Sequence, residues 1–172
     1  TRYETLTFRG GPCAGTNPVT QAAINPGTIT IPDSGAAAPY PSSIVVGNSS
    51  ADARVVAQVR VSLNGFTHTF PDDVDIVLQG PEGQAVMLMS DAGGSFDATG
   101  AILTFDDAAA ALLPDFGAIT TGVYRPSDFD PGDILPAPAP MASPGGLSVF
   151  SGSRPFGTWN LYVADDAGAD SG

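Results

Sequence analysis

The sequence contains no lysine, one cysteine and one histidine among its 172 residues. Because Cys13 has no second cysteine to pair with, an internal disulfide framework and a thiolate zinc site are both excluded. His68 alone cannot supply a histidine-rich metal site or a two-histidine mechanism. In its strand-like context we expect His68 to donate a hydrogen bond to a backbone carbonyl rather than to act as a general base.

Basic residues are also scarce. Six arginines stand against eighteen acidic residues, which gives a net charge of −12. The arginines are scattered singly, so the sequence has no basic patch that could neutralise phosphates, and we expect neither nucleic acid nor an anionic membrane surface as a partner. No apolar run approaches the roughly 20 residues that a membrane span needs, so none is predicted.

Sequence signatures of several common protein classes are absent as well. The sequence has no G-x-S-x-G nucleophile motif, no EF-hand spacing and no internal repeat. Asp73 and Asp166 could in principle act as the paired carboxylates of a glycosidase, but nothing in the sequence distinguishes an acid from a base. The sequence therefore predicts a protein without enzymatic activity.

Turn-forming residues are abundant. The 21 glycines and 16 prolines separate short stretches rich in β-branched residues, a pattern typical of an all-β fold. Alternation of apolar and polar residues predicts about nine short strands, which fit an antiparallel β-sandwich in a single domain. The strands are expected at roughly 4–9, 28–31, 43–46, 55–64, 75–79, 85–90, 102–105, 147–150 and 158–164.

The longest predicted strand, residues 55–64, has an apolar and a polar face. Alternation places five apolar side chains toward the core, those of Val55, Ala57, Val59, Val61 and Leu63. The sequence QGPEGQ at 79–84 predicts a hairpin turn. The run DDAAAALL at 106–113 favours one or two helical turns, and the proline-rich residues 114–146 are expected to run extended over the surface.

Aspartate makes up sixteen of the eighteen acidic residues, and it gathers at the ends of predicted strands. Calcium takes six to eight oxygen ligands at about 2.3–2.6 Å, so the convergence of many carboxylates at one end of a sandwich predicts a calcium site. Taken alone, each aspartate more often caps a turn without a metal. The candidate ligands are Asp72, Asp73, Asp75, Asp91, Asp106, Asp107, Asp165, Asp166 and Asp170.

An ordered series of motifs in this chain resembles a known family. HTFPDDVDIVL is followed by QGPEGQAVMLM, LTFDDAA, YRP, FSG and GTWNLYVADDAGADSG. The series is similar to the P domain (Homo B domain) of proprotein convertases in its bacterial secreted form, over roughly 29–172. The resemblance implies a jelly-roll-like sandwich with Asp73, Asp75, Asp165, Asp166 and Asp170 as calcium ligands, and Asp106 and Asp107 with less support.

The family also gives a context for this module. In kexin-like proteases the domain follows a subtilisin-like catalytic domain and supports its folding and its calcium dependence. In bacteria, similar modules are attached to many secreted proteins without proteolytic activity. The resemblance therefore implies a secreted or extracellular location at the cell surface.

The sequence departs from the family at both ends. Family members continue past the DSG turn into a final strand of the kind G-x-W-x-L. Here the sequence stops at Gly172, directly after this turn. Residues 1–12 form a strand-like extension ahead of a sandwich at 13–172, with Tyr3, Leu6 and Phe8 as candidate partner-binding residues. We hypothesise that residues 1–9 of one copy fill the gap in the next copy, which gives a head-to-tail homopolymer. The alternative is that the final strand is simply missing from the sequence.

These expectations combine into a non-enzymatic, calcium-stabilised extracellular sandwich with a structural or assembly role. The first rival is an accessory domain of a secreted subtilisin-like protease, which would act beside another domain of that protein. The second rival is a carbohydrate-binding or adhesion module, in which tyrosines or Trp159 would stack on sugar rings. Asn48 begins an Asn-Ser-Ser sequon and is a candidate glycosylation site in a host that glycosylates.

Overall fold

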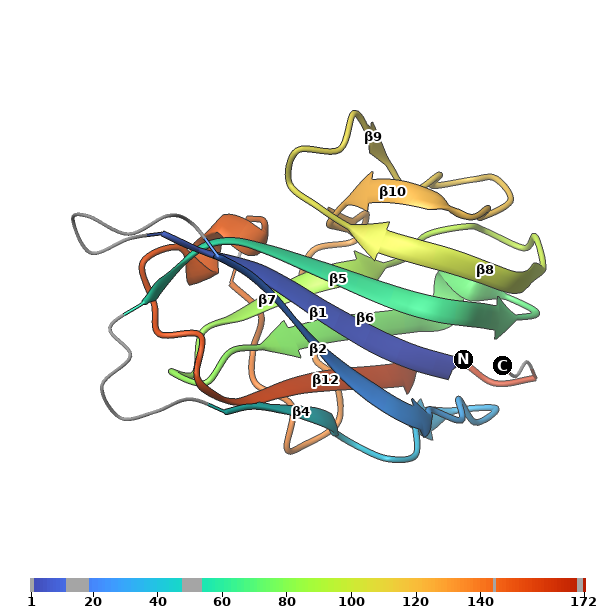
Figure 1. Ribbon diagram of the computed structural model, residues 1–172. Helices are drawn as coiled ribbons and strands as arrows, with labels where there is room; N and C mark the ends of the chain where they lie inside the picture. Colours follow the sequence, from blue (N-terminus) through green and yellow to red (C-terminus); the bar gives the residue numbers. More distant parts are fainter. Residues whose placement is uncertain (1, 12–18, 48–53, 144, 170–171) are drawn as a thin grey trace.

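Two β-sheets face each other in a computed structural model of the chain (Figure 1). The structure describes residues 2–11, 19–47, 54–143, 145–169 and 172, and for 2–11 and 19 the backbone alone. Almost all regular structure within these ranges is strand, so the predicted all-β sandwich is confirmed. Cys13, Asn48 and Asp170 lie outside the described residues. No helix in the described part of the chain is long and apolar enough to cross a membrane.

The first sheet is antiparallel except at one edge. Its strands pair antiparallel from β2 through β1 and β5 to β8, whereas β10 runs parallel to both β8 and β9. In spatial order the strands are β2 (Val19–Thr28), β1 (Arg2–Gly11), β5 (Val55–His68), β8 (Ala98–Phe105), β10 (Gly122–Arg125) and β9 (Ala111–Leu112).

The second sheet is built around β12, the last strand of the described chain. Its neighbours are β6 on one side and both β3 and β4 on the other. In spatial order the sheet contains β11 (Ser127–Asp128), β7 (Ala85–Ser90), β6 (Val74–Gln79), β12 (Gly157–Asp165) and β3 (Gly35–Ala36), with β4 (Ser42–Val46) also on β12. The predicted hairpin at 79–84 is present between β6 and β7, where the Gly80 amide donates to the Gln84 carbonyl.

The main core lies between the two sheets. Its largest fully buried side chains are aromatic, among them Phe66, Phe105, Phe150 and Trp159. The rings of Phe150 and Trp159 meet edge to face with centroids 4.9 Å apart, and the Trp159 indole donates to the Pro155 carbonyl at 2.8 Å. The buried indole thus keeps a hydrogen-bond partner, as such a group requires.

Strand β5 corrects the predicted face of residues 55–64. Val59, Val61 and Leu63 are buried as expected, but near the start of the strand Val56 is buried and Ala57 is exposed. The pairing with β1 shifts there by one residue, because Arg9 pairs with Gln58 and Gly10 with Val56. An extra residue in one strand of a pair exchanges the two faces, and simple alternation cannot reveal it.

The second sheet is covered on its outer face as well. Residues 129–143, which we call the cover segment, lay Leu135 and Ala139 against a second buried cluster that includes Val77 and Tyr162. Tyr40 donates from its hydroxyl to the Pro136 carbonyl at 2.6 Å and packs edge to face on Tyr162. This part of the proline-rich stretch therefore packs on a sheet, where the sequence suggested a weakly structured path.

Three other local predictions are wrong. The strand expected at 28–31 is not formed, because β2 ends at Thr28 and Thr30 makes only an isolated bridge with Ala38. The expected helix at 106–113 is a turn followed by β9, because the Asp106 side chain accepts from the Ala108 amide and its carbonyl accepts from Ala109. The strand expected at 147–150 is a short 3₁₀ helix, Leu147–Phe150. A second 3₁₀ turn, Pro71–Asp73, leads directly into β6.

Candidate metal centre

Three aspartates from distant parts of the chain meet at one end of the second sheet. Asp75, Asp133 and Asp166 each offer a carboxylate oxygen, and these oxygens lie within 4.8 Å of one another. Two oxygens that bind the same calcium ion at about 2.4 Å are at most about 4.8 Å apart, so this spacing suits a single ion. Asp75 is 4% exposed, Asp133 is half-buried and Asp166 is exposed, so the group has a buried side and an open side.

The fold explains this convergence. Asp75 stands on the same face of β6 as Val77, because residues two apart in a strand share a face. That face lies beneath the cover segment, which carries Asp133. Asp166 follows β12, and its amide donates to the Asp73 carbonyl at 2.9 Å. Pairing of β12 with β6 sets Asp165 opposite Val74, so the end of β12 reaches the start of β6.

Ser90 joins a fourth carboxylate to this group. Its hydroxyl oxygen lies 2.9 Å from an oxygen of Asp91 and 2.9 Å from an oxygen of Asp133. A hydroxyl has a single proton, so it can satisfy only one of these acceptors at a time. Asp91 has a left-handed φ of 50°, which is uncommon outside glycine. We call Asp75, Asp91, Asp133 and Asp166 the carboxylate centre.

Asp72 and Asp73 flank the carboxylate centre from the 3₁₀ turn. Asp72 accepts from the Gly94 amide at 3.1 Å, and its charge raises the pKa values of Asp91 and Asp166. Asp73 ends this turn and precedes β6, so it does not belong to the strand that carries Asp75. Its backbone carbonyl instead holds the amide of Asp166.

Burial and mutual repulsion act together on the carboxylate centre. Burial raises the pKa of Asp75 to about 7; the Ser90 hydroxyl opposes this rise, and the charges of Asp133, Asp166 and Asp91 add to it. Burial also raises the pKa of Asp91 to about 6, and the pKa of Asp166 is raised chiefly by burial and then by Asp133. Several carboxylates thus compete for protons near neutral pH, which is the condition that a bound cation relieves.

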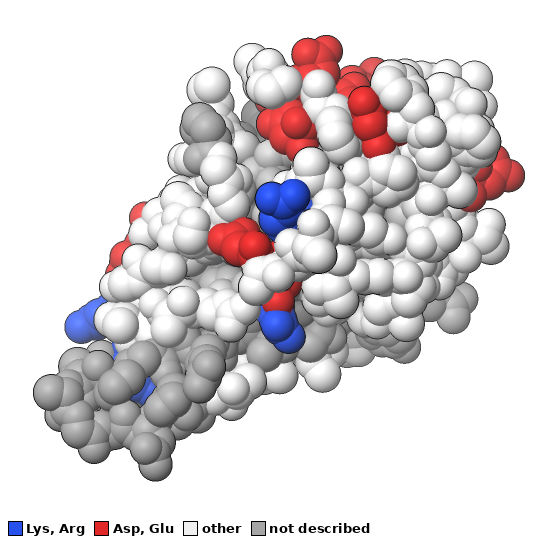
Figure 2. Space-filling model, turned by 90° about the horizontal axis from the view of Figure 1, so that it is seen from above, with Lys and Arg blue, Asp and Glu red and all other residues white. Residues whose placement is uncertain are grey.

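Acidic side chains extend beyond the carboxylate centre. Asp128, in β11 just before the cover segment, has a pKa raised by burial and by the charges of Asp133 and Asp130. In the face drawn in Figure 2, Asp and Glu side chains gather together, and the few basic side chains visible are scattered. No Arg is among the causes that shift the pKa values of Asp75, Asp91 or Asp166.

Asp106 lies elsewhere and is held by protein groups. It is 2% exposed, forms an ion pair with Arg60, and accepts from the Gln58 amide at 3.0 Å. An opposite charge and two side-chain or backbone donors satisfy a buried carboxylate without a metal. The structure therefore does not bring Asp106 to the carboxylate centre.

Asp107 also has a different position. Its two carboxylate oxygens accept from the backbone amides of Leu147 and Ser148, at 2.8 and 2.7 Å. These are the first amides of the 3₁₀ helix Leu147–Phe150, which has no side-chain cap from its own N-cap residue, Gly146. A carboxylate from the turn after β8 thus anchors this helix.

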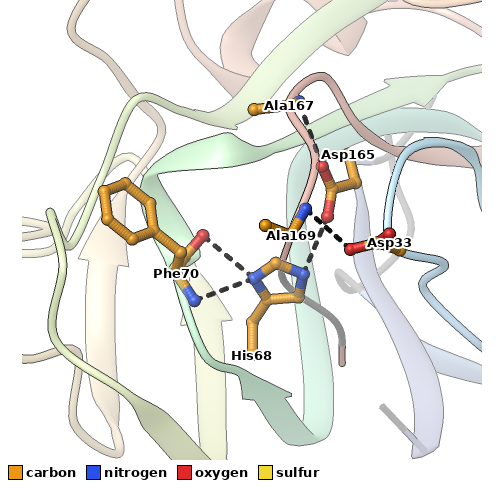
Figure 3. A network of polar contacts seen from close by, with 6 residues as sticks. All are labelled: Asp33, His68, Phe70, Asp165, Ala167 and Ala169. Carbon is orange, nitrogen blue, oxygen red and sulfur yellow. Dashed lines mark hydrogen bonds and ion pairs between the residues drawn. The ribbon is translucent and has the colours of Figure 1, made fainter.

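His68 and Asp165 form a buried pair (Figure 3). Both side chains are fully buried, with His68 Nε2 3.0 Å from Asp165 Oδ2 and His68 Nδ1 2.9 Å from the Phe70 carbonyl oxygen. His68 Nδ1 also lies 3.2 Å from the Phe70 amide nitrogen, so the backbone of one residue offers this ring nitrogen both a donor and an acceptor. The other Asp165 oxygen accepts from the Ala167 amide at 3.1 Å.

The pair ties the end of β5 to the end of β12. Burial raises the pKa of Asp165, and its bonds to Ala167 and His68 oppose that rise. The contact of His68 with a backbone carbonyl is the one predicted for a structural histidine. Asp165 therefore faces His68, while the next residue, Asp166, faces the carboxylate centre.

Asp133 is the residue that sequence reasoning missed. It lies in the stretch DFDPGD at 128–133, where acids flank a proline and a glycine. Asp91 and Asp166 were identified because each follows a predicted strand. The stretch does not follow a predicted strand, and only β11, two residues long, places it beside β7.

Comparison of the chain with family models, curated proteins and solved structures found no match. The similarity to P domains rests on the sequence motifs and stays a prediction.

Without a metal, the free energy of unfolding should fall as the pH rises from about 4 to about 7. Folded-state pKa values of about 7 for Asp75 and about 6 for Asp91 lie above their ordinary value of 3.8. At a pH between the ordinary and the folded-state pKa values, the folded state binds more protons than the unfolded state. Raising the pH therefore lowers the free energy of unfolding. Thermal melts in chelator measure this, and Asp75→Asn should flatten the decline. A melting temperature that rises over the same range would contradict the predicted repulsion.

Loss of the Asp107 carboxylate should destabilise the fold independently of calcium. Asp107→Ala removes both acceptors at the 3₁₀ helix and should cost about 1–2 kcal/mol of unfolding free energy, as for the loss of a helix cap. Chemical denaturation with and without calcium measures the effect, and Asp97→Ala, at an exposed turn position, serves as the control. A deficit that calcium abolishes would instead count Asp107 among the metal ligands.

Proposed function

We propose that this chain is a non-enzymatic, calcium-stabilised β-sandwich with a structural role outside the cell. The observation that carries the proposal is the meeting of Asp75, Asp133 and Asp166 within the span of one ion. The three residues come from β6, the cover segment and the end of β12. An ion bound there would join three segments that the sequence keeps far apart.

The donor set favours calcium over other metals. All the candidate side-chain donors are oxygens, whereas zinc prefers the nitrogen and sulfur of histidine and cysteine. Magnesium demands a near-ideal octahedron and keeps several waters. Calcium accepts irregular sites with carboxylates from flexible loops, which suits the mixture of buried Asp75 and exposed Asp166.

The surroundings of the carboxylate centre support a role in stability. The buried Asp75 faces the cover segment. That segment supplies the half-buried Asp133, and the exposed Asp166 follows β12. Extracellular calcium modules function with dissociation constants of about 10⁻⁴ to 10⁻³ M, a range open to such partly exposed sites. The proposal places the protein in a calcium-rich extracellular medium, as the P-domain resemblance also implies.

The two rivals have weaker support. An accessory role beside a subtilisin-like protease rests on the resemblance alone. A carbohydrate-binding role calls for exposed aromatic rings, but Trp159 and Tyr162 are buried and Tyr40 packs on Tyr162. Among the residues whose side chains the structure describes, the large exposed aromatic rings are those of Phe96 and Phe116, which do not form a strip along one sheet.

Calcium should raise the melting temperature, and the carboxylate centre should be required for this. At about 100 times its dissociation constant a ligand adds about 2.7 kcal/mol of stability, which corresponds to roughly 5–11 °C for a domain of this size. Melts of the wild type, Asp75→Asn, Asp133→Asn and the control Asp97→Asn, each with calcium and with chelator, measure the effect.

The variants should separate ion binding from folding. Asp133→Asn should abolish the response to calcium while leaving the chelated protein at least as stable as the wild type, because it removes one of the repelling charges. Asp97→Asn should respond like the wild type. An equal calcium response in Asp133→Asn, Asp75→Asn and the wild type would refute the site, and no response in the wild type would refute the proposal.

A further inference from the structure

Strand β1 occupies an interior position in the first sheet. It pairs along its length with β2 on one side and with β5 on the other (Figure 1). It is the first strand that the structure describes, and residues 12–18 connect it to β2.

The place that β1 fills must be filled by some strand. On β5, Val59, Val61 and Leu63 are at most 2% exposed, and they pair in register with Phe8, Leu6 and Glu4 of β1. Removal of β1 would leave the amides and carbonyls of β2 and β5 unpaired along both edges, which is costly. Any copy whose own β1 is elsewhere therefore has to accept an equivalent strand.

Charge distinguishes β1 from the remainder of the chain. Residues 1–11 contain two of the six arginines and one of the eighteen acidic residues, a net charge of +1. The remaining residues contain four arginines and seventeen acidic residues, a net charge of −13. Opposite net charges favour the encounter of this strand with another copy of the acidic sandwich.

We propose that β1 is exchanged between copies, so that the β1 of one copy lies between β2 and β5 of another. This proposal rests on the structural role proposed above and names a second copy of this chain as the partner. The contacts formed between copies are those that the structure shows within one copy, so no new surface is needed. Reciprocal exchange gives a closed dimer, and one-way exchange continues into a filament.

The start of β1 lies at the same end of the sheet as residue 172 (Figure 1). Gly172 lies beside Ile31, just after β2, and against Thr67 at the end of β5. Figure 1 shows the two termini next to each other at this end of the sheet. An incoming β1 would thus begin beside residue 172 of the copy that receives it, and its connection would leave from the opposite end.

A cysteine pair across β1 and β5 tests the proposal. Thr5 and Ser62 are cross-strand partners, and such pairs have Cα separations of about 4.5–5.5 Å, which a disulfide can bridge. Thr5→Cys and Ser62→Cys are combined in a Cys13→Ser background, and the protein is refolded at several concentrations before oxidation. Exchange predicts reducible covalent dimers or longer ladders on a non-reducing gel, increasing with protein concentration.

A second pair serves as the matched control. Ser62 also pairs with Thr104 of β8, within the part of the chain that exchange leaves intact. Ser62→Cys with Thr104→Cys should therefore give the monomer band at every concentration. For the Thr5 and Ser62 pair, only an intrachain bond at every concentration, or no disulfide at all, would overturn the exchange.

The result is separable from the calcium proposal. Monomers alone, in a protein whose melting temperature calcium still raises, would overturn the strand exchange and leave the metal centre intact. Covalent ladders in a protein that does not respond to calcium would overturn the metal centre and leave the exchange intact.

Discussion

The electrostatic cost of bringing Asp75, Asp91, Asp133 and Asp166 together is the constraint on which the second sheet depends. Burial and repulsion raise the pKa of Asp75 to about 7, so at neutral pH the site needs either protons or a cation. The arginines are few, and Arg60 is already paired with Asp106. A hard cation supplies the missing positive charge and at the same time fixes the geometry.

This constraint links otherwise separate parts of the fold. The cover segment buries Leu135 and packs Phe129, Ala139 and Ala142 on the two apolar clusters, while Ile134 and Met141 are exposed. Its attachment also involves hydrogen bonds, such as Tyr40 to Pro136, and Asp133 at the carboxylate centre. In the same region, the buried pair of His68 and Asp165 holds the end of β12 in place, and the next residue, Asp166, reaches the carboxylate centre.

Much of the fold was accessible from the sequence, because alternation and turn residues report directly on strands. Prediction failed where one residue changes the pattern, as at Ala57, where a register shift reverses the faces of β5. For the site, strand ends identified Asp75, Asp91 and Asp166 correctly as neighbours. Asp106 and Asp107 follow a strand too, but their partners, Arg60 and the 3₁₀ helix, are brought near only by tertiary packing. Asp133 was missed because no local pattern of apolar and polar residues predicts that the cover segment packs on the second sheet.

Proton release on binding is the most direct test of the central claim, that a cation takes the place of protons at the carboxylate centre. Isothermal titration of calcium into the metal-free protein at pH 6.5, in two buffers with different ionisation enthalpies, measures both the stoichiometry and the protons released. A saturable site with net proton release is expected, because the pKa of Asp75 is about 7 before the ion binds. Absence of binding, or binding with the same heat in both buffers, would contradict the account.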